Sequence, residues 1–215
     1  MKIILVRHAE SAGDPFATPG RQAHGFLSES PGIEQAVKLR KYFEKEKIDV
    51  ILCSNLGRAI QTAEIAVEKG YRNFVLCDFL KEWMPNPELK TAPSTRFEEI
   101  MRQQRENFAE DTWKTELGEG AFDLMARICP PLLLELKKIG IHARYGGFVP
   151  SDEGRNLSVA IFAHGGSLNV ILSFLLNLQP FPVSRFAFSL TGVAEIEFSE
   201  MNGVYYPRLN IPAPY

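Results

Sequence analysis

Short apolar runs alternate with longer amphipathic segments along most of the chain. The runs lie at 2–6, 49–53, 72–77 and 157–163, and each predicts a strand. The run at 2–6 has no polar alternation, which is typical of a strand that is covered on both faces, and the run at 49–53 predicts a second buried strand. Strands that alternate with helices predict an α/β fold, here a three-layer α/β/α sandwich with a mostly parallel central sheet.

Three of these runs are followed by helical patterns. Ser30 is a plausible N-cap for a helix that has Pro31 in its first position and runs to about Lys47. Ser54-Asn55 can cap a helix from Leu56 to about Lys69, and a third helix is expected from Gly165 to Leu178.

The character of the chain changes between 82 and 120, where prolines punctuate a loop and a lid-like insertion is expected. Thr95 and Glu98 form a capping-box pattern for a helix through Phe108. The aromatic residues of this region predict core and lid packing, with one or two of them against a substrate: Trp83, Phe97, Phe108, Trp113 and Phe122.

The remaining elements follow from proline and glycine. A helix is predicted from about Gly120 to Ile139, with Pro130-Pro131 breaking or kinking it. The glycine-rich residues 140–156 predict a loop. Asn202-Gly203 between apolar runs at 193–198 and 204–209 predicts a hairpin.

Length and composition indicate one globular domain over residues 1–215. The chain is 45% hydrophobic and 23% charged, and its formal net charge is -2. This charge argues against nucleic acid or a polybasic membrane surface as a partner. The sequence does not specify the oligomeric state, and a homodimer stays open.

The cysteines and apolar segments bear on location. Cys53, Cys77 and Cys129 form no CxxC pair, which favours a reducing compartment and offers no zinc site. The apolar run before Arg7 is too short for a signal peptide, and the apolar stretch 159–178 is interrupted by polar residues and glycines. We therefore expect a cytoplasmic protein.

Histidines and arginines stand where the predicted strands end. Arg7-His8 follows the first strand, Arg58 lies shortly after the second, and His164 follows the late strand. Carboxyl ends of parallel strands meet at one sheet edge, where ligands bind in such folds. Gly165 opens a helix whose free N–H groups attract anions. Arg58 opposes the helix dipole, which suggests that an anion binds there.

Blander and rival interpretations apply to the same residues. A lone His after a strand is more often structural, and Arg58 alone would be a solvated helix residue. Two histidines also suggest a metal, but arginines would repel the ion and no carboxylate lies at ligand spacing. Arginines with neutral imidazoles suit a phosphoryl group instead. We therefore expect a small phosphorylated substrate and neither metal nor cofactor.

These residues resemble the histidine phosphatase superfamily, the phosphoglycerate mutase-like proteins. Residues 5–11 (LVRHAES) resemble its RHG signature, with Ala9 in place of the usual Gly, and residues 25–36 resemble the segment before its first helix. Residues 53–64 (CSNLGRAIQTAE) resemble the second arginine motif, and 161–168 (IFAHGGSL) the second histidine motif. Leu80-Lys81-Glu82 is similar to the proton-donor motif.

The resemblance implies a role for each residue. His8 would attack phosphorus and form a phosphohistidine, while Arg7, Arg58 and His164 bind the phosphoryl oxygens. Glu82 would protonate the leaving group and then activate water, with Asp78, Asp14 and Glu119 as rival acids. Gly165 and Ser11 complete the expected phosphate-binding set. One departure is Asp14, at the position where the family usually places an Asn that donates a hydrogen bond to phosphate. A carboxylate that faces the phosphate there would repel it.

Three functions fit this resemblance. A mutase needs extra basic residues to hold a second anionic group, and the insertion has no Arg-Arg pair. A phosphomonoester phosphatase is therefore favoured over a phosphoglycerate mutase-type phosphotransferase. A non-catalytic protein that binds phosphorylated ligands draws support from Asp14, but binding alone requires no nucleophile with a matched acid.

Overall fold

The computed structural model describes residues 1–12, 25–68, 71, 73–90, 93–106, 116–181 and 185–212. Its strands are β1 (Lys2–Arg7), β2 (Val50–Ser54), β3 (Asn73–Cys77), β4 (Ile141–Arg144), β5 (Gly147–Pro150), β6 (Ser158–Ala163), β7 (Val193–Met201) and β8 (Val204–Asn210). Its α-helices are α1 (Gly32–Phe43), α2 (Gly57–Ala66), α3 (Ser94–Glu106), α4 (Ala121–Lys138) and α5 (Gly165–Leu175).

The strands form one eight-stranded sheet in the order β3-β2-β6-β1-β7-β8-β5-β4. The half from β3 to β1 is parallel, but every pairing from β1 to β4 is antiparallel. The α/β prediction is thus confirmed, whereas the expectation of a mostly parallel sheet is wrong because the sheet is mixed. The pairs β4–β5 and β7–β8 are joined by two-residue turns, which allow only antiparallel neighbours.

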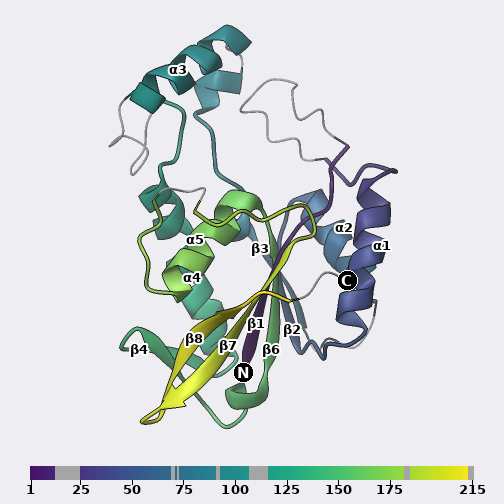
Figure 1. Cartoon of the computed structure of the whole chain (residues 1–215), viewed down its shortest axis with the longest axis vertical. Coiled ribbons are helices and arrows are strands. Elements are labelled where there is room, and N and C mark those ends of the chain that lie inside the picture. Colours follow the sequence, from purple (N-terminus) through teal and green to yellow (C-terminus); the bar gives the residue numbers. More distant parts are fainter. Residues whose placement is uncertain are drawn as a thin grey trace.

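Helices cover both faces of the parallel half (Figure 1). Alternate residues of β1 point to opposite faces: Ile3 and Leu5 join the core beneath α4 and α5, whereas Ile4 and Val6 join the core beneath α1 and α2. All four are fully buried. This explains why the strand carries no polar alternation.

Residues 140–156, predicted as a loop, contain the hairpin of β4 and β5. The prediction is wrong because the turn signal is atypical. Tyr145 and Gly146 both adopt positive φ, of 51° and 72°, where a tyrosine is unusual. The predicted Asn202-Gly203 turn does join β7 to β8, with positive φ at both residues.

Several helix ends differ from the prediction. Pro31, not Ser30, is the N-cap of α1, and the first-turn N–H of Gly32 donates to Ser28 Oγ over 2.8 Å. Leu56 precedes α2, so neither Ser54 nor Asn55 is its cap. The α3 helix begins at Ser94, which places Thr95 inside the first turn, and the predicted end at Phe108 lies outside the described residues.

The α4 helix runs without interruption through Pro130 and Pro131, so the predicted break is absent. Neither proline is fully buried: Pro130 is exposed and Pro131 is half-buried. Leu124, Ile128 and Leu132 are fully buried in the core. Their packing offsets the hydrogen bonds that the two prolines cannot donate.

The described residues of the predicted insertion, 82–90, 93–106 and 116–120, lie beyond the end of the sheet at which β1 finishes (Figure 1). Leu89, Ile100 and Leu117 form a small core there, with Trp83 packed against it. Trp83 therefore packs against buried cores, as predicted for the aromatic residues of this region, whereas a lid role for the insertion stays a prediction. The side chain of Phe97 and residues Phe108 and Trp113 lie outside the described part of the chain.

Candidate active site

The predicted strand-end residues meet at one edge of the sheet. Register pairs Arg7 of β1 with Ala163 of β6, so His8 and His164 leave adjacent strands at the same level. Their ring centroids are 4.9 Å apart. Arg58, from the first turn of α2, donates from Nε to Nε2 of His8 over 3.2 Å. The topology thus brings two histidines and an arginine together from three distant parts of the chain.

The hydrogen bonds of His8 determine its tautomer. Nδ1 lies 2.6 Å from the carbonyl oxygen of Ala9, which can only accept, so Nδ1 carries the proton. Nε2 then keeps its lone pair, in agreement with its role as acceptor from Arg58. A neutral imidazole with an available Nε2 lone pair is the form that can attack an electrophile.

Burial is the main reason that His8 stays neutral. It lowers the pKa of His8 to about 3, and the charges of Arg58 and Arg7 act in the same direction. Burial also lowers the pKa of His164 well below its usual value, helped by His8 and the arginines. Both imidazoles are therefore neutral near pH 7.

The low pKa of His8 should appear in the pH dependence of stability. Below about pH 6.5 the unfolded chain binds a proton at His8, whereas the folded chain does not until about pH 3. This contribution is present above pH 6.5 and is lost as the pH falls towards 3. From pH 6.5 to 5 the loss from His8 is roughly 2 kcal/mol of unfolding free energy.

Urea unfolding of the wild type and of His8→Asn at pH 7 and pH 5 measures this effect. The variant should lose less stability on acidification than the wild type. His142→Asn is the matched control, because His142 is exposed on β4, and its loss should equal that of the wild type. Equal losses in all three proteins would contradict the assignment.

A short chain of hydrogen bonds supports the residue that follows His8. The N–H of Ala9 donates to Thr62 Oγ1 over 2.9 Å, and that hydroxyl donates to the carbonyl of Arg58 over 2.7 Å. Thr62 therefore ties the residue after His8 to the helical turn that carries Arg58. Ala9 is fully buried and is not among the residues with positive φ, so replacement of the usual Gly causes no backbone strain here.

His164 and Arg7 each present a buried polar atom that suits an anion. Nε2 of His164 lies 2.8 Å from Ser54 Oγ, and Arg7 Nη1 donates to the carbonyl of Phe188 over 2.6 Å. In the described part of the chain, Nδ1 of His164 and Nε of Arg7 have no hydrogen-bond partner. Buried polar groups are nearly always paired, so these atoms fit a site that a polar ligand completes.

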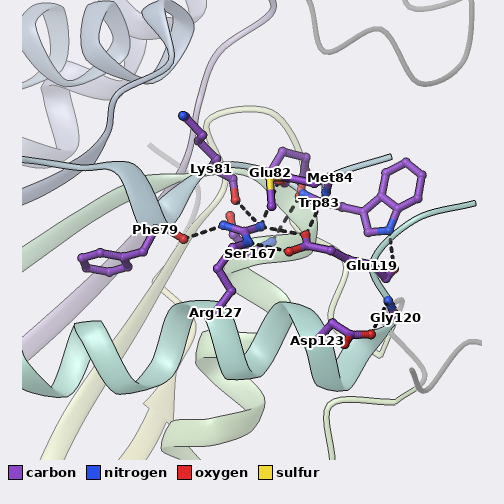
Figure 2. A network of polar contacts seen from close by, with 10 residues as sticks. All are labelled: Phe79, Lys81, Glu82, Trp83, Met84, Glu119, Gly120, Asp123, Arg127 and Ser167. Carbon is purple, nitrogen blue, oxygen red and sulfur yellow. Dashed lines mark hydrogen bonds and ion pairs between the residues drawn. The ribbon is translucent and has the colours of Figure 1, made fainter. Parts of the chain in front are cut away.

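The Glu82 side chain lies against the first turn of α5 (Figure 2). Its carboxylate accepts from the N–H groups of Gly166 and Ser167, each over 3.2 Å, and of Trp83 over 2.9 Å. A Cβ on Gly166 would lie 2.6 Å from Glu82 Oε1, so only glycine allows this approach. Glu82 also influences the buried Arg58, whose pKa is lowered by burial and raised by the Glu82 charge. The carboxylate is therefore fixed beside the cationic cluster.

The rival acids have other partners. Asp78 is exposed and pairs with Lys81, which lowers the pKa of Asp78, with a further contribution from Asn55. Glu119 forms an ion pair with Arg127. Asp14 lies outside the described residues.

The two remaining phosphate-binding predictions stay predictions. Ser11 pairs with Leu27 in an isolated β-bridge three residues beyond His8. Gly165 is the first residue of α5 and lies beside the Arg7 guanidinium. A Cβ added at Gly165 would lie 3.6 Å from Arg7 Cζ. That backbone N–H lies at the helix terminus where anions are favoured.

Sequence reasoning missed four contributors to the site: Ser54, Thr62, Glu119 as an ion-pair partner, and Arg127. Thr62 could have been found, because it lies four residues after Arg58 on the same helix face. Ser54 ends its strand at the site edge. Nothing local to Arg127 indicates its contacts.

The described residues offer neither a metal-ligand cluster nor a membrane-spanning helix. They contain no group of three or more His, Cys, Asp or Glu side chains placed to hold a metal ion. None of the described helices combines the length and apolar character needed to cross a bilayer.

Comparison with known families agrees with this geometry. Residues 3–207 match the model of the histidine phosphatase superfamily (branch 1). This chain belongs to that superfamily. The predicted resemblance to this superfamily is thereby confirmed. None of the curated proteins matches the chain.

Solved structures share the fold. A mycobacterial glucosyl-3-phosphoglycerate phosphatase superposes with a TM-score of 0.73 at 21% identity, covering 100% of this chain and 99% of its own. A phosphoserine phosphatase mutant from Entamoeba histolytica, in complex with phosphoserine, gives 0.63 at 19% identity, covering 97% and 94%. Membership of the superfamily makes a phosphatase or mutase-type enzyme the supported class.

Proposed function

We propose that this protein is a metal-independent phosphomonoester phosphatase that works through a phosphohistidine on His8. The observation that carries the proposal is the His8 imidazole, buried and neutral, with its proton fixed on Nδ1 by the Ala9 carbonyl. A protein that only binds phosphate has no need for a nucleophilic lone pair directed at an arginine and accompanied by a fixed carboxyl group.

In the first step Nε2 of His8 attacks phosphorus and forms a P–N bond, while the P–O bond to the leaving group breaks. Protonated Glu82 gives its proton to the departing oxygen, so the alcohol leaves neutral. Arg7, Arg58 and His164 hold the three remaining phosphoryl oxygens, where charge accumulates in a loose transition state. Arg58 exchanges its bond to Nε2 for one to a phosphoryl oxygen, which releases the lone pair.

In the second step water attacks the phosphohistidine. The Glu82 carboxylate takes one proton from the water as the new P–O bond forms. The P–N bond breaks, its electron pair returns to Nε2, and inorganic phosphate leaves. His8 and Glu82 are then back in their starting protonation states.

Hydrolysis is favoured over phosphoryl return because the sequence of the insertion contains no Arg-Arg pair that could hold a second anion. Arg96 of α3 is engaged with Glu99 over 3.1 Å and with Glu116 over 3.0 Å. A mutase must retain its product until the phosphoryl group returns, which needs unpaired cations near the site.

Three unpaired, buried cysteines suit a reducing compartment, and a cytoplasmic location is part of the proposal.

Phosphorus NMR separates hydrolysis from mutase activity. We expect simple phosphomonoesters to release inorganic phosphate, while 3-phosphoglycerate is not converted to 2-phosphoglycerate at a useful rate. Priming with the bisphosphate is the control, because a mutase depends on a phosphorylated nucleophile. Rapid interconversion of the two phosphoglycerates would make the protein a mutase, and no reaction with any ester would make it a binding protein.

A further inference from the structure

Arg127 of α4 reaches the chain segment that carries Glu82 (Figure 2). Its Nη1 donates to the carbonyl of Phe79 over 2.7 Å, and its Nη2 donates to those of Lys81 and Glu82 over 3.2 and 3.1 Å. Residues 81–84 form neither helix nor strand. One guanidinium therefore holds three carbonyl groups: that of Phe79 in the short 3-10 helix Asp78–Leu80, and those of Lys81 and Glu82 in the irregular residues that follow it.

Glu119 binds both Arg127 and the far end of the same segment, at Met84. It receives Nε and Nη2 of Arg127 over 2.6 and 2.9 Å, and its Oε2 accepts from the N–H of Met84 over 2.8 Å. The indole of Trp83 donates to the Glu119 carbonyl over 2.5 Å. The Arg127 and Glu119 side chains are only 19% and 12% exposed, so water screens this pair weakly.

The direction of these contacts matters for chemistry. The carboxylate of Glu82 touches the beginning of α5, the helix that follows His164, whereas its backbone touches Arg127 of α4. Contacts at both ends of the residue fix the position of the carboxyl group relative to the nucleophile. A general acid displaced by about 1 Å can lose on the order of 10²-fold in rate.

We propose that Arg127, held by Glu119, is a positioning residue for Glu82, which rests on the proposed function of Glu82 as general acid. Arg127 makes no described hydrogen bond or ion pair with His8 or the phosphoryl-binding residues, and its charge is only the last of several causes that lower the pKa of His164. It acts by fixing the backbone from Phe79 to Met84. A purely structural Arg127 would stabilise the fold without affecting proton transfer.

The test compares kcat/KM for an alkyl phosphate, whose leaving group needs a proton, with that for 4-nitrophenyl phosphate, whose leaving group does not. Arg127→Ala should lower the alkyl value on the order of 10²-fold and the aryl value by less than about 10-fold. Adding Glu82→Gln to Arg127→Ala should reduce the alkyl value far less than Glu82→Gln does alone, since the two residues act as one unit. Additive losses, or equal losses for the two substrates, would overturn the proposal.

A matched control addresses stability. Arg40 of α1 also bonds a backbone carbonyl, that of Ile65 over 3.1 Å, and pairs with Glu68, away from the site. Arg40→Ala should lower the melting temperature without changing the alkyl-to-aryl ratio. Glu119→Gln supplies a milder second variant if Arg127→Ala does not fold. It keeps an acceptor for Met84 and should shift the ratio in the same direction.

Amide NMR gives a readout that needs no turnover. In the wild type the N–H groups of Gly166 and Ser167 donate to the Glu82 carboxylate. Arg127→Ala should shift both amide signals towards their positions in Glu82→Gln, whereas Arg40→Ala should leave them in place. If the wild type hydrolyses neither ester, the proposed function has failed, and this measurement alone decides the positioning role. Unmoved amide signals in folded Arg127→Ala and Glu119→Gln would refute it.

Discussion

Replacing His8 by alanine is expected to lower phosphomonoester turnover by on the order of 10⁴-fold or more, because the reaction loses its covalent route. In the proposed mechanism His8 Nε2 supplies the lone pair that forms the P–N bond, whereas Nε2 of the neutral His164 lies within hydrogen-bond distance of Ser54 Oγ. Phosphate release from an aryl phosphate measures the loss. The wild type should also yield a phosphorylated peptide containing His8 after brief incubation, acid-free quenching and mass spectrometry.

His142→Ala is the control for this experiment, since His142 is exposed on β4 and should leave turnover unchanged. Circular dichroism and a melting curve check that His8→Ala still folds. Substantial turnover in His8→Ala, or a phosphate trapped on another residue such as His164, would give the nucleophilic role to a different group.

The core of the site could be predicted from sequence because each residue stands at a strand end or in the first turn of the helix that follows one. Buried runs identify β1, β2 and β6, and the carboxyl ends of parallel neighbours meet by topology. Arg7-His8 and His164 follow two of those strands directly, and Arg58 lies in the turn of helix after the third. No side-chain geometry was needed to bring them together.

The rest depends on contacts that local patterns do not encode. Glu119 and Arg127 sit in different elements from the segment that they hold, so their partners are set by the packing of α4 against the insertion. The β4–β5 hairpin escaped prediction because its turn places a tyrosine at positive φ. The antiparallel half of the sheet follows from that hairpin and from the β7–β8 pairing.

Glu82→Gln is expected to lower kcat/KM for an alkyl phosphate by about 10²–10⁴-fold, the usual contribution of general acid–base catalysis. An alkoxide is a poor leaving group and needs the Glu82 proton as the P–O bond breaks. A 4-nitrophenolate leaves without one, so kcat/KM for the aryl ester should change little. Glutamine keeps the size of the side chain and one acceptor for the amides of α5.

The second half of the reaction provides an independent check on the same variant. In the proposed mechanism Glu82 also takes the proton from the attacking water, so Glu82→Gln should hydrolyse its phosphohistidine slowly with either substrate. With the aryl ester this predicts a rapid burst of one 4-nitrophenolate per site, followed by slow turnover. Stopped-flow absorbance resolves the two phases, and the phosphorylated His8 peptide should accumulate during the slow one.

Asp78→Asn is the matched control for Glu82→Gln, because Asp78 is an exposed carboxylate four residues away that pairs with Lys81. It should leave both the alkyl-to-aryl ratio and the burst unchanged. If Glu82→Gln slows the two esters equally in kcat/KM, or slows neither, then Glu82 is not the acid. Glu119 would be the next candidate, since it accepts from Met84 two residues beyond Glu82. The burst tests the role of Glu82 as base separately from its role as acid. Loss of the base slows hydrolysis of the phosphohistidine and produces a burst, even when the aryl leaving group needs no proton.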